Sequence, residues 1–330
     1  MTYEMMYYIF LCIVGFIFCF FRISSDRVYF TFVFLLFFIY SLVTRFSGFE
    51  IDFITYAKEL EIDSYDIYYL KEPVYWLFSR VVYDFFASKE LTFVFFDSIA
   101  FVLVIVASRK MNLPQFFPFL FLLFFPAVMG MNNVYRQYLA YAIYIFFFSL
   151  VISKESPFKS IFFLVLSILT HNVVALFSPL LLIFNGKKRL ELKVFIIYTV
   201  IIMLLPFALA TKSNSDTGTL GGEVYLIVFF LIILFYSFTC KFRFDDLSSR
   251  FLHFFIYMFS LALTSFIVMG GAQSKRVGMF MLMVSLVPLI LVIEKKYKQK
   301  KIVRATIYTV LIMPTFFFSS SRDMLLTVVN

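Results

Sequence analysis

The feature that most constrains this chain is a series of long apolar segments that recurs from one end of the sequence to the other. Each segment runs for roughly 17 to 25 residues between charged breaks, which is the length that an α-helix needs to cross a bilayer. Hydrophobic residues make up 62% of the 330 positions and charged residues only 15%, which leaves no room for a large soluble domain. We therefore predict an all-α, polytopic membrane protein with a single transmembrane domain over residues 1–330.

The apolar segments predict about twelve transmembrane helices. The expected spans are residues 5–21, 28–44, 91–107, 114–129, 135–152, 158–170, 173–184, 194–210, 223–239, 251–269, 277–293 and 302–318. The sixth and seventh are short, so the break between them at His171 and Asn172 could equally be the tip of a re-entrant pair.

Lysine and arginine accumulate in the cytoplasmic loops of membrane proteins, so the basic loops predict the orientation of the chain. These loops are residues 22–27, 109–110, 154–159, 187–193, 241–250 and 295–301. If all of them lie inside, both termini and the alternate loops lie outside. The predicted outer loops are residues 45–73, 130–136, 171–172, 211–222 and 270–276. Because these clusters explain the formal net charge of +9, we expect the lipid bilayer, and no nucleic acid, as a partner.

This alternation holds only if residues 74–86 do not cross the membrane. The segment is short for a span and carries Arg80 and Asp84 one helical turn apart, so we interpret it as an amphipathic helix on the outer surface. It lies in a long extracytoplasmic loop over residues 45–90. We expect a multi-pass protein of the bacterial inner membrane whose active face is extracytoplasmic.

Two acidic residues of the long outer loop are candidate catalytic groups. Glu50 and Asp52 follow a predicted membrane exit closely and alternate with apolar residues. A carboxylate held near apolar surface can have a raised pKa and act as a base toward a sugar hydroxyl. We interpret the acids further along the loop as a solvated face; they are Glu59, Glu61, Asp63 and Asp66.

Asp97 is an acidic residue inside a predicted span, about two turns from its outer end. An ionisable group at that depth is costly. It indicates either a polar cavity used by the substrate or a structural pair with a neighbouring helix.

Several cations at predicted outer helix ends are poorly explained by topology. A diphosphate is well matched by convergent guanidinium groups, so these cations are candidate phosphate contacts. Arg136 is favoured because it follows two asparagines and precedes Gln137, and Arg276 because neighbouring glycines permit close approach. Isolated cations can also extend to lipid head groups, which is the alternative for single residues. The set is Arg45, Arg136, Lys275, Arg276 and Arg322.

His171 is one of only two histidines and lies at a predicted outer tip. This position suggests proton transfer or a phosphate contact, as an alternative to a purely structural hydrogen bond.

The three cysteines lack the spacing of a zinc site, and nucleotide-binding, serine-hydrolase and metalloprotease motifs are missing from the sequence. We therefore expect no metal and no cofactor.

An ordered set of short motifs resembles the EpsG family, which groups Wzy-type polymerases of bacterial O-antigen, capsule and exopolysaccharide pathways. The resemblance covers about residues 45–293. Gly48 and Tyr56 lie four residues to either side of Asp52, and Glu72-Pro73 precedes an aromatic helix. The later motifs are Asn133-x-x-Arg136-Gln137-x-x-Ala140, Thr170-His171 and Lys275-Arg276.

This resemblance implies a membrane glycosyltransferase that transfers a glycan from undecaprenyl diphosphate onto a lipid-linked repeat unit, with a fold similar to polyprenyl-dependent (GT-C-like) glycosyltransferases. Asp52 would be the base or acceptor anchor, with Glu72 or Glu50 as a partner, although the order Gly-Phe-Glu-Ile-Asp leaves open which of the two acids of that motif acts. A chain-length regulator is a further candidate partner. The implied substrate contacts are Arg45, Tyr56, Asp97, Arg136, Gln137, Lys275 and Arg276, with His171 near the phosphate.

Two other classes stay open on the sequence. A flippase for lipid-linked oligosaccharides would also use cations and an embedded acid, but its polar residues should be spread through the membrane rather than gathered at one face. An O-antigen ligase or an acyltransferase acting on the same glycans would also need a large outer loop.

Overall fold

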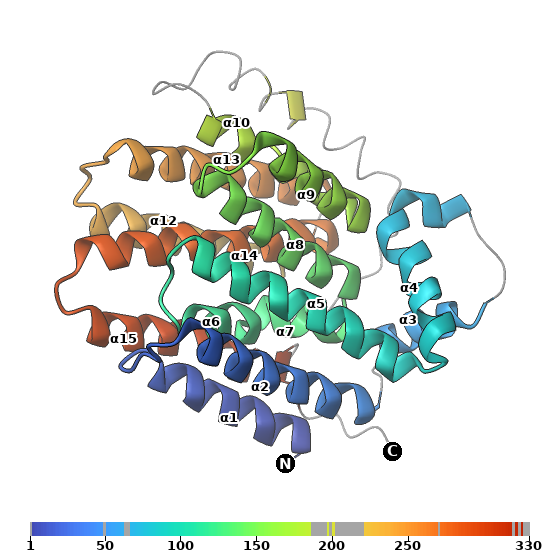
Figure 1. Cartoon of the computed structure of the whole chain (residues 1–330). Helices are drawn as coiled ribbons and strands as arrows, with labels where there is room; N and C mark the ends of the chain where they lie inside the picture. The colour runs from blue at the N-terminus through green and yellow to red at the C-terminus, as the bar shows by residue number, and fades with distance from the viewer. Residues whose placement is uncertain are drawn as a thin grey trace. The chain divides into compact units, whose positions relative to one another are not determined.

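The computed structural model describes residues 2–48, 51–62, 67–185, 197, 200–201, 221–269, 271–318, 321–322 and 325. Over these residues the chain is helical and contains no strand. It separates into two compact units. Figure 1 colours the chain from blue at the N-terminus to red at the C-terminus. Unit 1 is Met1–Asn172 with Lys301–Asn330, and unit 2 is Val173–Lys300.

Unit 1 is a bundle in which α5 packs against both α2 and α8, while α9 packs against α8 and α1 against α2 and α6. Gly15 permits close approach in α1, because a Cβ atom there would lie 2.6 Å from the Cβ atom of Phe119. The elements of unit 1 are α1 (Tyr3–Ile17), α2 (Asp26–Phe46), α3 (Ile51–Leu60), η1 (Ile67–Lys71), α4 (Pro73–Phe86), α5 (Lys89–Lys110), α6 (Phe117–Leu123), α7 (Phe125–Asn132), α8 (Tyr135–Ile152), α9 (Pro157–Thr170), α15 (Lys300–Ile312, but for its first residue) and α16 (Pro314–Phe317).

One end of unit 1, which we call the basic end, gathers three of the predicted cytoplasmic loops. Arg109 at the end of α5 pairs with Asp26 at the start of α2, with 2.8 Å between Nη2 and Oδ2. Lys110 pairs with Glu155 in the loop between α8 and α9. The hydrogen bond from Lys110 lowers the pKa of the Glu155 carboxyl below its ordinary value. These contacts bring three basic loops together, as the alternation predicted.

The opposite end of unit 1, the site end, gathers three of the predicted outer loops. Arg45 near the end of α2 contacts Asp97 in the first half of α5 and the carbonyl oxygen of Met131 near the end of α7. Glu72 in the long loop contacts Arg136 at the start of α8 and His171 just after α9. Within unit 1, three basic loops and three predicted outer loops therefore lie at opposite ends of the bundle, and which end faces out stays a prediction.

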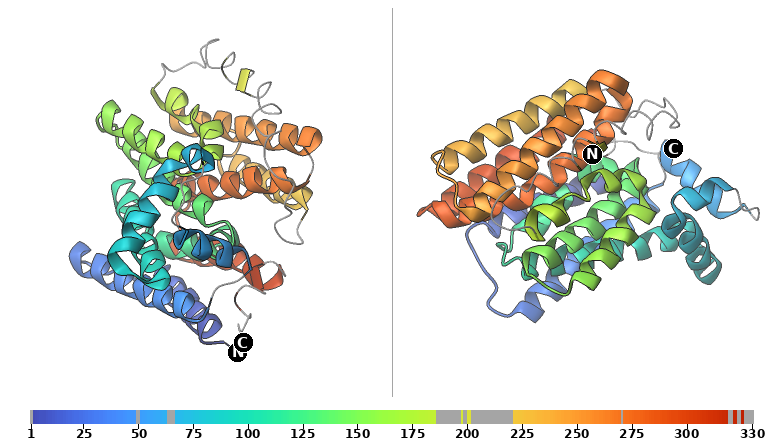
Figure 2. Two further views of the ribbon diagram at one scale, coloured as in Figure 1. Left: turned by 90° about the vertical axis from the view of Figure 1, so that its right-hand side faces the viewer. Right: turned by 90° about the horizontal axis from the view of Figure 1, so that it is seen from above.

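Helices α3 and α4 lie across the site end. Figure 1 shows α4 running across the direction of α2, α5, α8 and α9, and the left panel of Figure 2 looks onto this end with α3 and α4 in front. The predicted amphipathic helix is present as α4: Tyr75, Trp76 and Arg80 are buried, whereas Val81 and Phe85 are 63% and 82% exposed. Such a helix suits the surface of a bilayer, where its apolar stripe faces lipid.

Unit 2 is built on α12, α13 and α14, which pack against one another. At one end Lys295 pairs with Asp245, and this hydrogen bond holds the pKa of the Asp245 carboxyl well below its usual range. At the other end Gly222, the first residue of α12, permits close packing against α13, because a Cβ atom at this position would lie 3.0 Å from the Phe266 side chain. The elements of unit 2 are η2 (Asn172–Phe177, but for its first residue), α10 (Leu180–Asn185), α12 (Gly222–Thr239), α13 (Asp246–Met269) and α14 (Gly271–Lys296).

Within the described residues, six helices are long and apolar enough to cross a membrane; they lie in α2, α5, α8, α12, α13 and α14. The predicted span over residues 194–210 falls mostly outside the described residues. Three further expected spans are each interrupted near a proline, Pro126, Pro179 or Pro314, because proline cannot donate the i to i−4 hydrogen bond and its ring clashes with the preceding turn. The protein is thus a polytopic helical membrane protein, and a count of twelve spans stays a prediction.

Candidate active site

A buried carboxylate, that of Glu72, is the centre of the candidate site. Glu72 is 3% exposed and is the N-cap residue of α4, which Pro73 starts with a φ angle already suited to a helix. One carboxylate oxygen, Oε2, accepts from Arg136 Nη1. The other, Oε1, lies 2.7 Å from His171 Nδ1 and 3.2 Å from the backbone nitrogen of Asn172. Three chain segments therefore converge on a single acid.

These contacts limit the hydrogen-bond roles within the cluster. An ionised carboxylate only accepts hydrogen bonds, so when Glu72 is ionised Nδ1 of His171 is the donor of their hydrogen bond. A neutral His171 then has its lone pair on Nε2, the arrangement in which an imidazole can take up a proton. In this arrangement Glu72 contacts the His171 ring through one oxygen and the Arg136 guanidinium through the other.

Aromatic rings from α3 and α4 surround Arg136. Its guanidinium carbon lies 5.1 Å from the Trp76 ring centroid and 5.7 Å from that of Tyr56. Both separations are within the range of cation–π attraction. The Tyr56 ring also packs edge-on against Tyr75 at 5.8 Å. Arg136 is 18% exposed, so it lies between the buried Glu72 carboxylate and the surface of the site end.

One residue of the first acidic motif, Asp52, lies in α3, the helix that also carries Tyr56. Asp52 belongs to the first turn of α3, next to the buried Phe53, whose ring centroid lies 5.1 Å from that of Tyr135. Glu50 lies outside the described residues. Gln137 is fully buried in the first turn of α8, directly after Arg136. The catalytic and binding roles predicted for these residues stay predictions.

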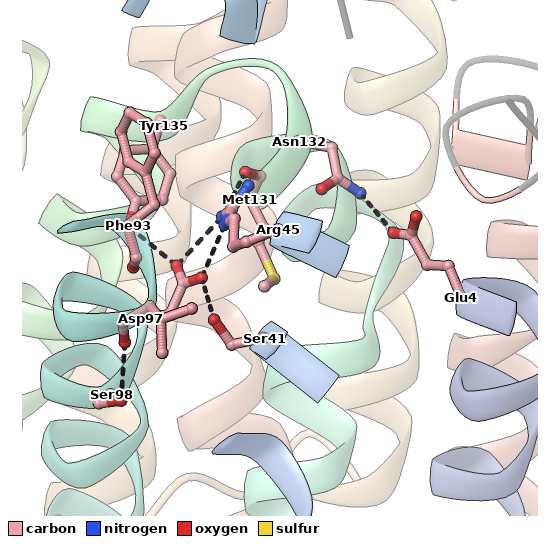
Figure 3. A network of polar contacts seen from close by, with 10 residues as sticks. Glu4, Ser41, Arg45, Phe93, Asp97, Ser98, Met131, Asn132 and Tyr135 are labelled. Atoms are coloured by element: carbon pink, nitrogen blue, oxygen red, sulfur yellow. Dashed lines mark hydrogen bonds and ion pairs between the residues drawn. The ribbon is translucent and has the colours of Figure 1, made fainter. Parts of the chain in front are cut away.

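Arg45 and Asp97 form a second buried cluster at the site end. Arg45 Nε donates to Asp97 Oδ2 at 2.8 Å and Nη2 donates to Oδ1 at 3.1 Å. Figure 3 shows the carboxylate facing Arg45, Ser41 and Tyr135. Ser41 donates to Oδ2 at 2.6 Å and Tyr135 to Oδ1 at 2.9 Å. Arg45 and Asp97 are only 2% and 0% exposed.

Asp97 thus forms an ion pair with Arg45 of the neighbouring helix α2, which is one of the two interpretations that the sequence left open. The bidentate geometry and the added hydroxyl donors compensate the burial of both charges. Arg45 does not extend to lipid head groups; its guanidinium also donates to the carbonyl oxygen of Met131 at 3.0 Å and lies 4.3 Å from the ring centroid of Phe53. The substrate contacts predicted for Arg45 and Asp97 stay predictions.

Of the remaining predicted cations, Arg322 is an exposed residue of unit 1, whereas Lys275 and Arg276 belong to unit 2. They lie in the first turns of α14, where Lys275 is 4% exposed and Arg276 is half-buried. Their predicted role as diphosphate contacts stays a prediction. Among the described residues, no group of three histidine, cysteine, aspartate or glutamate side chains could hold a metal ion.

Four contributors to these clusters were not among the candidates from the sequence: Ser41, Tyr75, Trp76 and Tyr135. Only Trp76 carried a usable signal, because it is the one tryptophan of the chain and follows Glu72 by four residues. Among 51 phenylalanines and 21 tyrosines, single aromatic residues at the site end cannot be told from lipid-facing ones.

The helices and the buried polar clusters at one end define a multi-pass membrane protein with a candidate site at a bundle end. The EpsG family model matches residues 28–326, nearly the whole chain, so the chain belongs to the EpsG family, which is a Wzy-type polymerase-like family. Comparisons with curated proteins and with solved structures give no match.

Proposed function

We propose that this protein is a polysaccharide polymerase that transfers a glycan from undecaprenyl diphosphate onto a lipid-linked repeat unit at the site end of unit 1. Membership of the EpsG family supports a polymerase-like role. The observation that carries the assignment to this site is the buried Glu72 carboxylate, which holds a histidine on one oxygen and an arginine on the other. Glycosyl transfer from a diphosphate needs a base for the attacking hydroxyl and a positive charge for the leaving group. His171 and Arg136, both bound to Glu72, are residues of these two kinds.

In the proposed reaction, an acceptor hydroxyl oxygen attacks the anomeric carbon of the donor glycan. The bond from that carbon to the diphosphate oxygen breaks, and its electron pair leaves with undecaprenyl diphosphate. Asp52 or the His171 imidazole takes the proton of the attacking hydroxyl. A guanidinium group carries five N–H donors, so the contact of Arg136 with Glu72 is compatible with a second contact to a phosphate oxygen, where it would stabilise the departing charge.

The proposal requires the site end to face the periplasm or cell exterior, and labelling tests this. A cysteine at Lys58, exposed on α3, is expected to react with an impermeant thiol reagent in intact spheroplasts. A cysteine at Lys154, exposed at the basic end, should react only after the membrane is permeabilised. Cys12, Cys19 and Cys240 are replaced by alanine beforehand. The reverse labelling pattern would place the site on the cytoplasmic side and end the proposal.

The function is tested by a gel of surface glycans from a strain that lacks the gene and is complemented with variants. Wild-type protein should restore the ladder of repeats, whereas Arg136→Ala should leave only single-repeat glycans, with long chains reduced at least ~100-fold because a positioned transition-state contact is lost. Arg109→Ala, which removes an arginine from an exposed ion pair at the basic end, is the matched control and should restore the full ladder.

The same gel separates the alternative functions. Total loss of surface repeats in the deletion strain, with lipid-linked repeats retained on the cytoplasmic side, would indicate a flippase. Long glycans that accumulate on the lipid carrier without transfer to a final acceptor would indicate a ligase. Either result contradicts a polymerase.

A further inference from the structure

The hydroxyl group of Tyr75 is a buried polar group that the proposed reaction does not use. Tyr75 lies in α4, three residues after Glu72, and is 1% exposed. Within the described part of the chain its Oη atom has no hydrogen-bond partner. A buried hydroxyl in that state costs about 1–3 kcal/mol, so native proteins almost always satisfy such groups. An unsatisfied hydroxyl beside a candidate site indicates a missing partner, such as a substrate atom.

The surroundings of Tyr75 indicate which kind of atom that partner is. The Tyr75 ring packs against Trp76 at 5.0 Å and against Tyr56 at 5.8 Å, and both of these rings face the Arg136 guanidinium. A ligand oxygen near Arg136 and Tyr75 would receive donors from a cation and from a phenol. An anionic oxygen gains from both, because hydrogen bonds to a charged acceptor are about twice as strong as neutral ones.

We infer that Tyr75 is a further substrate contact, whose hydroxyl donates a hydrogen bond to a phosphate oxygen of the lipid-linked diphosphate that Arg136 also contacts. This inference rests on the proposed function and adds a residue to it. The half-buried Tyr56 ring packs edge-on against the buried Tyr75 ring. For a diphosphate to reach the Tyr75 hydroxyl, this inference requires the side chains around it to move.

The test is the affinity of purified protein in nanodiscs for undecaprenyl diphosphate, with three tyrosine variants that each lose one hydroxyl. Tyr75→Phe should weaken binding about 10- to 100-fold, the loss expected for one hydrogen bond to a charged group. Tyr138→Phe is the matched control, since Tyr138 is 2% exposed and its hydroxyl is likewise unsatisfied among the described residues. It should bind as the wild type does.

Thermal unfolding of the same samples separates a substrate contact from a structural one. Tyr75→Phe and Tyr138→Phe remove unsatisfied groups and should unfold at or above the wild-type temperature. Tyr135→Phe should unfold at a lower temperature, because its hydroxyl donates to Asp97 at 2.9 Å and lies 3.1 Å from the carbonyl oxygen of Phe93. A fall for Tyr75→Phe as large as that for Tyr135→Phe would overturn the inference, since the hydroxyl would then be structural.

Three outcomes of the binding measurement also overturn it. The first is that Tyr75→Phe binds undecaprenyl diphosphate as tightly as the wild type, while Arg136→Ala binds it weakly. This result would refute the role of Tyr75 and leave the proposed function intact. The second is disappearance of the Tyr75→Phe difference when phosphatidylglycerol is added, which would show a general phospholipid contact. The third is an absence of undecaprenyl diphosphate binding by the wild type, which would remove the proposed function as well.

Discussion

Replacing Asp97 with alanine is expected to lower the free energy of unfolding by about 3–5 kcal/mol, because it leaves the Arg45 guanidinium buried without its counter-charge. Arg45 is 2% exposed, so water cannot replace the lost carboxylate without a rearrangement of the site end. Ser41 would also lose the acceptor that it now has at 2.6 Å. Unfolding by SDS in mixed micelles, followed by circular dichroism, measures the change.

A double variant tests whether the charges or the packing explain that loss. Arg45→Met with Asp97→Leu removes both charges and keeps an apolar side chain on each helix. Replacing a buried ion pair in this way is often neutral or stabilising, so the double variant should recover most of the loss. A cost below about 1 kcal/mol for Asp97→Ala alone, the value typical of exposed pairs, would show that the pair is solvated.

Glu72→Gln is expected to reduce polymerisation at least ~100-fold, the range for loss of a general base, because the His171 ring would lose the carboxylate that positions it, while the protein stays in the membrane. The amide has one oxygen in place of two and no charge. It therefore cannot hold the Arg136 guanidinium and the His171 Nδ1 proton together with the backbone N–H of Asn172. The length of surface glycans measures polymerisation, and an immunoblot of the membrane fraction measures the amount of protein.

Glu61→Gln provides the matched control for this variant. Glu61 lies at the same end of unit 1, where it pairs with Lys89 at 2.8 Å, but its side chain is 50% exposed. An exposed pair contributes little, so this change should leave glycan length unaltered. Long glycans from Glu72→Gln at a normal protein level would contradict a role for Glu72 in the reaction.

Much of the fold follows from local patterns in the sequence. The apolar run over residues 135–152 predicts α8 with the bounds that the structure gives. The spacing of Arg80 and Asp84, one helical turn apart in a short apolar segment, predicts α4 as an amphipathic helix. The proline interruptions of three expected spans were not predicted. Length and hydropathy alone identify the apolar run that contains Pro126 as a single span. Proline chemistry divides that run into α6 and α7, with Phe124 in an extended conformation between them.

The candidate site is less predictable, because its contacts join residues that are far apart in the chain. Glu72 and His171 are 99 positions apart, and Arg45 and Asp97 are 52 apart. The sequence indicates that these groups lie at one side of the membrane, and the resemblance ranks Asp52 first among the acids. It does not show that Glu72 is the acid that joins Arg136 to His171, or that Arg45 and Asp97 neutralise each other.

Reconstitution of the purified protein in liposomes with undecaprenyl-diphosphate-linked repeat units as the only glycan source tests the central claim most directly. Products released from the lipid are separated by length and identified by mass spectrometry. We predict chains of two and more repeats together with released undecaprenyl diphosphate from the wild-type protein, and neither product from Glu72→Gln. Single repeats alone from folded wild-type protein, or equal chain growth by Glu72→Gln, would contradict polymerisation at this site.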